Sequence, residues 1–278
     1  MKIIISAEST VDLTPELLKE YEIKTLPFTV LLGDKMGEDG DITAEEIFKF
    51  VAENKILPKT SAINEYQYNE YFTKLLQEGD AVIHFCLSSG ISCAYANAAR
   101  AAEHFENVYV IDTKSLSTGI ALLAIKAQKM ARQGASVEEI VKTVTTDTTN
   151  LNVSFVIDKL DYLKKGGRCS SLAAFGANLL QLHPQIVVSN GKMVSGKKYR
   201  GTFDKVVKAY CEDVSKDFEN ADKSVAFLTY TTAGDAAREV ALKTLTEAGF
   251  KEIYETNAGA TITSHCGPNT LGLLFLMK

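Results

Sequence analysis

The feature that most constrains this chain is a stretch of twenty residues, from Ala81 to Arg100, whose character changes once. An apolar run ends at Leu87, the small residues Ser88-Ser89-Gly90 follow, and an alanine-rich segment with high helix propensity comes next. This order predicts a strand, a tight turn and the start of a helix. The first N–H groups of a helix lack helical partners and lie at the positive end of its dipole, so this turn could hold an anion.

The hydroxyl groups of Ser89 and Ser92 would add two donors to such an anion site. The alternative is that one serine only caps the helix, which is the commonest task of such a residue. Taken by itself, the stretch favours the capping alternative.

Segments of strand and helix character alternate through the first half of the chain. Short β-type runs lie at 2–6, 81–87 and 108–111, and a longer one at 24–32 precedes a polar loop at 33–41. Helix starts are indicated by a Thr-Pro pair and by three capping boxes, at Thr14-Pro15, Thr43–Glu46, Asn64–Gln67 and Ser136–Glu139. This alternation predicts βαβ units and a mostly parallel sheet.

Ligands of parallel α/β sheets bind outside the carboxyl ends of the strands. Three polar turns are expected at or near that edge: Thr60-Ser61, Ser88–Ser92 and Asp112–Ser115. The sequence therefore predicts that hydroxyl groups from distant segments meet at one end of the sheet.

The second half of the chain has a different pattern of expected strands and helices. Asn190-Gly191 separates two strand-like runs, 184–189 and 192–198, which is a strong hairpin signal. A basic loop at 160–168 and a helix at 170–180 precede the hairpin, and helices at 203–218 and 235–248 with strands at 224–230, 251–255 and 271–277 follow it. We therefore expect an α/β protein with two domains: residues 1–157, Rossmann-like with a mostly parallel sheet, and residues 158–278, with a mixed sheet.

Composition excludes several classes of protein. The net charge of −5 provides no broad basic field for nucleic acid. No apolar run approaches the roughly 20 residues of a membrane span. The apolar run near the first residue is also too short for a signal peptide. The five cysteines are scattered without C-x-x-C spacing, as expected of free thiols in a reducing cytoplasm, so we expect no zinc or other metal site.

Among the histidines, His265 is the candidate for chemistry. It lies in a Ser-His-Cys-Gly-Pro segment that we expect to be a turn between two apolar strands. It could donate a hydrogen bond to an anion, or it could be a structural residue. His84 lies inside the apolar run and is expected to be buried.

A serine hydrolase is the main enzymatic alternative. Ser89 or Ser92 could be the nucleophile with His265 as its base, and a helix N-terminus could form the oxyanion hole. However, Ser88-Ser-Gly-Ile-Ser92 does not match the Gly-x-Ser-x-Gly elbow, and no acidic residue flanks the histidine. Nucleotide-binding glycine loops are missing as well.

Two basic groups lie in the second half, at 164–168 and at 197–200. Such groups are usually charged turns at the surface. If they face the serine turn, they could hold a phosphate or dock an acidic partner.

Taken together and in order, the motifs resemble those of DegV proteins, a family of bacterial fatty-acid-binding proteins. The resemblance rests on Glu8-Ser-Thr-Val-Asp-Leu, Thr60-Ser61, Leu87-Ser-Ser-Gly-Ile-Ser, Leu160 to Arg168, Gly191 to Arg200, and His265-Cys-Gly-Pro followed by Leu271-Gly-Leu. It spans nearly the whole chain.

The resemblance implies a two-domain fold that buries a long-chain fatty acid. Its implied ligand-binding residues are Thr60, Ser61, Ser89, Gly90, Ser92 and His265, with Thr60 and Ser92 on the carboxylate. Arg168 and Arg200 match two arginines associated with the acyl phosphate and with docking of a fatty-acid kinase. The chain would then be a cytoplasmic, monomeric carrier without catalytic residues or a cofactor. It would present the acid to that kinase for use in phospholipid synthesis, and transient contact with a membrane surface would fit this task.

Several residues depart from the usual family pattern. They are Ala7-Glu8 near the first strand, Ala62-Ile63 after Thr60-Ser61, Cys93 after Ser92, and His183, Tyr230 and Asn269 in the second half. The implied carboxylate ligands are intact, so we expect lipid binding to be retained.

Overall fold

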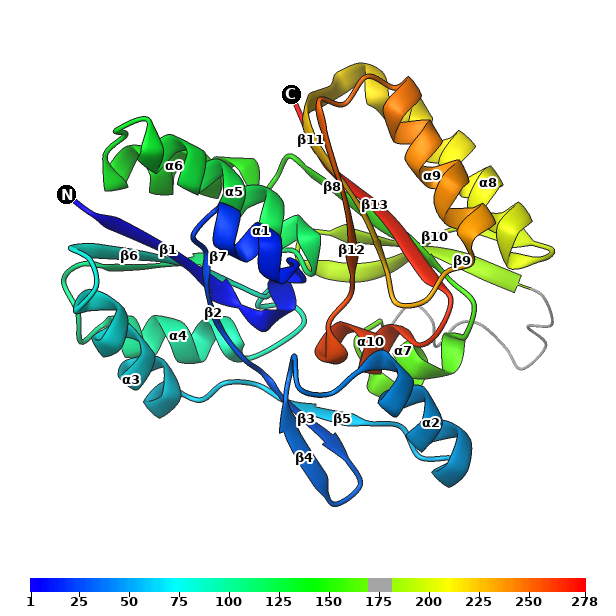
Figure 1. Cartoon of the computed structure of the whole chain (residues 1–278), viewed down its shortest axis with the longest axis horizontal. Helices are drawn as coiled ribbons and strands as arrows, with labels where there is room; N and C mark the ends of the chain where they lie inside the picture. The colour runs from blue at the N-terminus through cyan, green and yellow to red at the C-terminus, as the bar shows by residue number, and fades with distance from the viewer. Residues whose placement is uncertain (170–181) are drawn as a thin grey trace.

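The first sheet has four parallel strands in the order β2-β1-β6-β7 (Lys24–Leu26, Ile3–Glu8, Ala81–Cys86 and Val108–Asp112). The structure is a computed structural model, and it describes residues 1–169 and 182–278 (Figure 1). All six residues of β6 are buried, as a central parallel strand requires. The predicted parallel sheet is confirmed.

Helices cover both faces of this sheet. α3 and α4 lie on one face, and α5 and α6 lie on the other (Figure 1). The helix bounds are α1 Pro15–Glu20, α3 Glu65–Leu76, α4 Ala94–Ala102, α5 Thr118–Arg132 and α6 Val137–Asp147. The predicted caps are confirmed: Thr14 accepts a hydrogen bond from the N–H of Leu17, and reciprocal capping boxes open α3 and α6.

The second sheet has six strands in the order β10-β9-β8-β13-β11-β12. Their bounds are β8 Leu151–Ile157, β9 Leu182–Ser189, β10 Lys192–Arg200, β11 Ala221–Tyr230, β12 Glu252–Asn257 and β13 Thr270–Met277. Among the strands of residues 1–169 and 182–278, only β11 and β12 pair in parallel in this sheet, so the predicted mixed sheet is confirmed. Two helices, α8 (Phe203–Val214) and α9 (Asp235–Glu247), pack on its outer face, and a short 3₁₀ segment (Ser215–Asn220) follows α8 (Figure 1).

Strand β8 belongs to the second sheet, although the sequence analysis placed its residues in the first domain. It pairs antiparallel with β13 and β9. The change from one sheet to the other therefore falls between α6 and β8. Helix α5 contacts strands of both sheets, and buried residues from both, such as Val82 and Phe155, share one hydrophobic cluster. The division into two domains remains a prediction.

A third, small antiparallel sheet has the order β4-β3-β5 (Lys35–Glu38, Thr29–Leu32 and Lys59–Ser61) and packs with α2 (Ala44–Asn54), whose capping box is confirmed. The continuous strand expected over 24–32 is wrong, because the chain leaves β2 at Pro27 and enters β3. Proline has no N–H to donate to a ladder. The polar loop expected at 33–41 contains β4, and the turn expected at Thr60-Ser61 is the edge strand β5.

Two further segments expected as loops are helices. The basic segment forms α7 (Leu160–Gly166), and His265 lies in the last turn of α10 (Ala260–Cys266). The helix expected at 170–180 lies outside the described residues.

The predicted hairpin joins β9 to β10, and its turn residues Asn190 and Gly191 both have positive φ angles, 49° and 77°. Its tip contacts the turn after β6. The Ser88 hydroxyl donates a hydrogen bond to the Gly191 carbonyl oxygen over 2.7 Å. A Cβ atom on Gly90 would lie only 2.4 Å from that same oxygen, so the two backbones meet where no side chain fits.

We expect Gly90→Ala to destabilise the protein by about 1–3 kcal/mol, because a backbone contact cannot be relieved by side-chain rotation. Urea unfolding measures this change. Gly234→Ala is the matched control, since a Cβ atom there meets nothing within 4 Å. If Gly90→Ala were no less stable than the control, the close approach would not matter.

Candidate ligand-binding site

A cavity of about 730 Å³ opens beyond the carboxyl end of β6, between the first sheet, β5 and α10. This volume is in the range of small-molecule sites. Its lining includes all six residues that the sequence analysis named as ligand-binding: Thr60, Ser61, Ser89, Gly90, Ser92 and His265. Arg168 lies on its rim, whereas Arg200, at the end of β10, is not among its lining residues.

Thr60 and His265 are in direct contact, although 205 residues separate them in the sequence. The Thr60 hydroxyl and Nε2 of His265 are 2.8 Å apart. Burial, together with the positive charge of Arg168, lowers the pKa of His265 to about 4. The imidazole is therefore neutral near pH 7. If its hydrogen is on Nε2, it donates to the Thr60 oxygen and leaves the Thr60 hydrogen for a ligand.

Two buried carboxylates hold the start of α10, the helix that carries His265. Oδ1 of Asp12 accepts the N–H of Gly259 over 2.8 Å, and Oδ1 of Asp39 accepts the N–H of Ala260 over 2.7 Å. Burial raises the pKa of Asp12, and the nearby charge of Asp39 also raises it. These bonds satisfy N–H groups that a helix leaves unpaired at its start.

Helix α7 contacts α10 from the other side. A Cβ atom on Gly166 would lie only 2.9 Å from Nδ1 of His265. The absence of a side chain at Gly166 therefore leaves room for the imidazole ring.

The serines of the turn have different partners. Ser89 is hydrogen-bonded to Asp112, the last residue of β7. The Ser89 hydroxyl donates to the Asp112 carboxylate over 2.6 Å, and the Ser89 N–H donates to it over 3.1 Å. The Ser92 oxygen accepts the N–H of Ala94, the first residue of α4, over 3.2 Å. The N-cap residue is Cys93, whose side chain forms no capping bond, so Ser92 lies one position before the cap. A hydroxyl oxygen that accepts one bond still has its hydrogen to donate, so this bond leaves Ser92 able to bind a ligand.

The geometry does not assemble the pair that a serine hydrolase needs. Nε2 of His265 is bonded to Thr60, and Ser89 is bonded to Asp112. Within residues 1–169 and 182–278, neither Ser89 nor Ser92 forms a hydrogen bond with His265. The arrangement suits binding of an anion better than activation of a nucleophile.

A much smaller, mainly apolar cavity of about 30 Å³ adjoins the first one. Leu116, Ile262 and Cys266 line both cavities. The smaller cavity reaches Phe155 of β8 and Leu274 of β13 in the six-stranded sheet. The hydroxyl-bearing turns therefore line the main cavity, whereas the adjoining cavity exposes mainly apolar atoms, although Thr229, Thr231 and Thr270 also line it.

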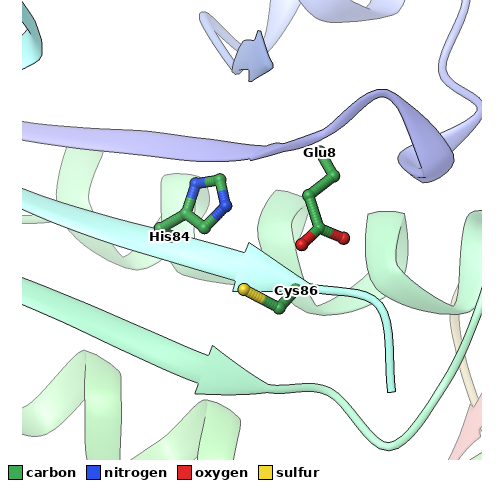
Figure 2. Close-up of side chains that lie close together, drawn as sticks. All are labelled: Glu8, His84 and Cys86. Carbon is green, nitrogen blue, oxygen red and sulfur yellow. The ribbon is translucent and has the colours of Figure 1, made fainter. Parts of the chain in front are cut away.

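Sequence reasoning missed the task of Glu8. Its side chain lies close to those of His84 and Cys86, between β1 and β6 (Figure 2). Its carboxylate accepts the Tyr68 hydroxyl over 2.6 Å and the N–H of Leu87 over 2.6 Å, where β6 passes into the serine turn. Burial raises the pKa of Glu8 to about 7. We assign Glu8 the role of holding this turn in position through its bond to Leu87. Only its position beside the Ser-Thr motif could have indicated that task.

His84 is fully buried, as predicted. Its Nδ1 atom is 2.8 Å from the Ser6 hydroxyl, and the rings of Tyr68, Tyr71 and Phe72 pack edge-on against it. Burial lowers its pKa to about 3.

Comparison with known proteins identifies the family of this chain. The family model described as "Uncharacterised protein, DegV family" matches residues 2–278. A fatty acid-binding protein of Thermotoga maritima is 30% identical over 98% of this chain and 96% of its own length.

Among solved structures, a DegV family protein from Thermus thermophilus, described by its fatty acid binding, has a TM-score of 0.93 at 27% identity, with full coverage of both chains. A stearic acid-binding protein from Eubacterium ventriosum has a TM-score of 0.87 at 25% identity and covers 99% of this chain and 98% of its own. The chain therefore belongs to the DegV family. In the part of the chain that the structure describes, every helix is too short or too polar to cross a membrane.

We expect acid to destabilise the protein partly through His84. Its pKa is about 3 in the folded state and about 6.5 in the unfolded chain, so below pH 6.5 only the unfolded chain takes up the proton. This residue should cost about 1.4 kcal/mol of stability for each pH unit between 6.5 and 3. His84→Gln should lower the slope of unfolding free energy against pH by that amount, as measured by urea titration from pH 5 to 8.

The difference between the two proteins above pH 7.5 isolates any change in packing, because the histidine is neutral there in both states. Equal slopes below pH 6.5 would contradict a neutral buried His84.

Proposed function

We propose that this protein binds a long-chain fatty acid in the main cavity, with the carboxylate at Thr60 and Ser92 and the acyl chain directed toward the smaller apolar cavity. The observation that carries the proposal is a cavity of about 730 Å³ lined by hydroxyl donors, beside a smaller, mainly apolar cavity that shares three apolar lining residues with it. Membership of the DegV family and the fatty-acid-binding descriptions of its relatives support it.

The two ends of the ligand contribute differently. Burial of a sixteen-carbon chain contributes on the order of 10 kcal/mol at about 0.8 kcal/mol per CH₂ group. Each hydrogen bond to the carboxylate contributes about 1.5–3 kcal/mol. The chain therefore supplies most of the affinity, while Thr60 and Ser92 fix the depth and orientation of the acid. His265 positions the Thr60 hydroxyl.

We further propose that the protein presents the bound acid to a fatty-acid kinase and is not itself an enzyme. The exposed Arg168 at the rim and Arg200 on β10 are the proposed residues for phosphate contact and kinase docking. A carrier of this kind acts as a cytoplasmic monomer, contacts membranes only transiently, and binds neither nucleic acid nor a cofactor.

Native mass spectrometry of the purified protein, with organic extraction of the ligand, tests fatty-acid binding directly. We expect a retained saturated or unsaturated acid of about sixteen to eighteen carbons, because such a chain gains about 0.8 kcal/mol per buried CH₂ group. A protein that neither retains nor rebinds palmitate would refute the carrier. Steady release of p-nitrophenol from an ester, abolished by Ser89→Ala, would instead establish the hydrolase.

We expect Ser92→Ala to weaken palmitate binding by about tenfold, since one hydrogen bond to a charged group is lost. It should leave the affinity for 1-hexadecanol nearly unchanged, and it should strongly slow acyl-phosphate formation in the presence of kinase and ATP. Fluorescence competition measures both affinities. Ser224→Ala on β11 is the matched control because Ser224 is exposed and lines none of the cavities described above. Wild-type binding and phosphorylation of Ser92→Ala would remove Ser92 from the site.

A further inference from the structure

Three side chains of metal-binding type converge on one buried point in the first sheet. Figure 2 shows Glu8 of β1 and His84 and Cys86 of β6 lying against one another. A carboxylate oxygen, an imidazole nitrogen and the thiol sulfur all lie within 4.8 Å of one another, and all three residues are fully buried. The parallel pairing of β1 with β6 produces this cluster, because residues two apart on a strand share one face of the sheet.

The imidazole of His84 has the hydrogen-bonding pattern of a metal ligand. Its Nδ1 atom is 2.8 Å from the Ser6 hydroxyl, whereas its Nε2 atom has no hydrogen-bond partner among the described residues. Buried polar atoms in folded proteins nearly always have one. Histidines that bind metals commonly donate the hydrogen of one ring nitrogen to a neighbouring oxygen, so that the lone pair of the other nitrogen faces the ion. With its hydrogen on Nδ1, His84 donates to Ser6 and leaves Nε2 for an ion.

The Glu8 carboxylate is held by the kind of outer hydrogen bonds that orient a metal ligand. It accepts the Tyr68 hydroxyl and the N–H of Leu87, each over 2.6 Å. The Tyr68 hydroxyl also interacts with the Cys86 thiol. A further oxygen donor therefore lies at the cluster beside the three side chains.

We propose that Glu8, His84 and Cys86 bind one structural zinc ion. Carboxylate, imidazole and thiolate are the ligands that zinc takes in proteins, in tetrahedral sites with bonds of about 2.0–2.3 Å. Such bonds place two ligand atoms about 3.3–3.8 Å apart, so small side-chain rotations bring the three atoms onto one ion. The Tyr68 oxygen is available as the fourth ligand.

The charge of the cluster also favours a divalent ion. Metal binding removes the proton of the Cys86 thiol. The thiolate and the Glu8 carboxylate then balance the two positive charges of zinc, while His84 stays neutral. The loaded site has no net charge, as a fully buried position requires. The pH dependence given above for His84 is that of the metal-free protein.

Zinc at this position would connect the first sheet to the serine turn. Glu8 also binds the N–H of Leu87, where β6 passes into that turn, so the ion would fix β1, β6 and the turn together. The inference does not depend on the proposed function. The spacing of the cysteines predicts no metal site, but a site assembled from two strands needs no spacing along the chain.

Cobalt(II) tests the site, because it replaces zinc and its absorption spectrum identifies the ligands. The wild-type protein is refolded from urea with Co²⁺ present, so that burial of the cluster does not block entry. We expect one Co²⁺ per chain, with a thiolate-to-cobalt charge-transfer band and the intense visible bands of a four-coordinate ion, all displaced by Zn²⁺. Zn²⁺ should also move the midpoint of urea unfolding to a higher concentration.

Two variants remove a ligand each. His84→Gln and Cys86→Ala should lower the zinc affinity by at least about a hundredfold, since loss of an outer hydrogen-bond partner alone costs about 10–100-fold. Cys211→Ala is the matched control, because it removes a buried thiol from the hydrophobic cluster of the second sheet. Cys93→Ala removes the exposed thiol. Both should keep the wild-type spectrum.

The wild-type spectrum decides the question even if a variant fails to refold, which far-ultraviolet circular dichroism detects. Refolded wild-type protein that shows no thiolate band with Co²⁺ would overturn the inference. A band that persists in Cys86→Ala and disappears in Cys93→Ala would overturn it as well, because the metal would then be bound at the surface.

Discussion

The whole site depends on the hydrogen bonds that Asp12 and Asp39 accept from the start of α10. These carboxylates come from the N-terminal quarter of the chain, whereas the helix is close to the C-terminus. A buried carboxylate is costly to desolvate, and N–H groups at the start of a helix offset that cost. Helix α10 is short, and its β-branched residues lower its helix propensity. The two distant carboxylates therefore bind the N–H groups at its start, a task that neighbouring side chains perform in longer helices.

The turn after β6 is constrained in the same way, from two sides. Glu8 accepts the N–H of Leu87 within the first sheet, and the carbonyl of Gly191 accepts the Ser88 hydroxyl from the second sheet. The turn is thus fixed by one partner from each sheet. Helix α5 connects the same two sheets through the shared hydrophobic cluster. The turn is therefore held at the place where the two sheets meet.

Local signals predicted the elements that local interactions form. The capping boxes of α2, α3 and α6 and the Asn190-Gly191 hairpin are confirmed because the residues that define each lie within a few positions of one another. Strand β5 was missed because three residues have no pattern of their own, and pairing with β3 makes them a strand. Helix α10 was missed because its caps are more than 200 residues away. The residues alone named Ser89, Ser92 and His265 and placed Thr60-Ser61 near the same sheet edge, but only the family resemblance made Thr60 a carboxylate ligand.

The sequence separation of Thr60 and His265 has a consequence for synthesis of the protein. The Thr60–His265 pair cannot form until α10 has left the ribosome, and closing so long a loop is slow. The proposed carboxylate site therefore exists only in the completed fold. A fatty acid bound there, as proposed, would stabilise that fold by mass action, in proportion to the logarithm of the acid's free concentration. The amount of folded protein would then follow the supply of that lipid.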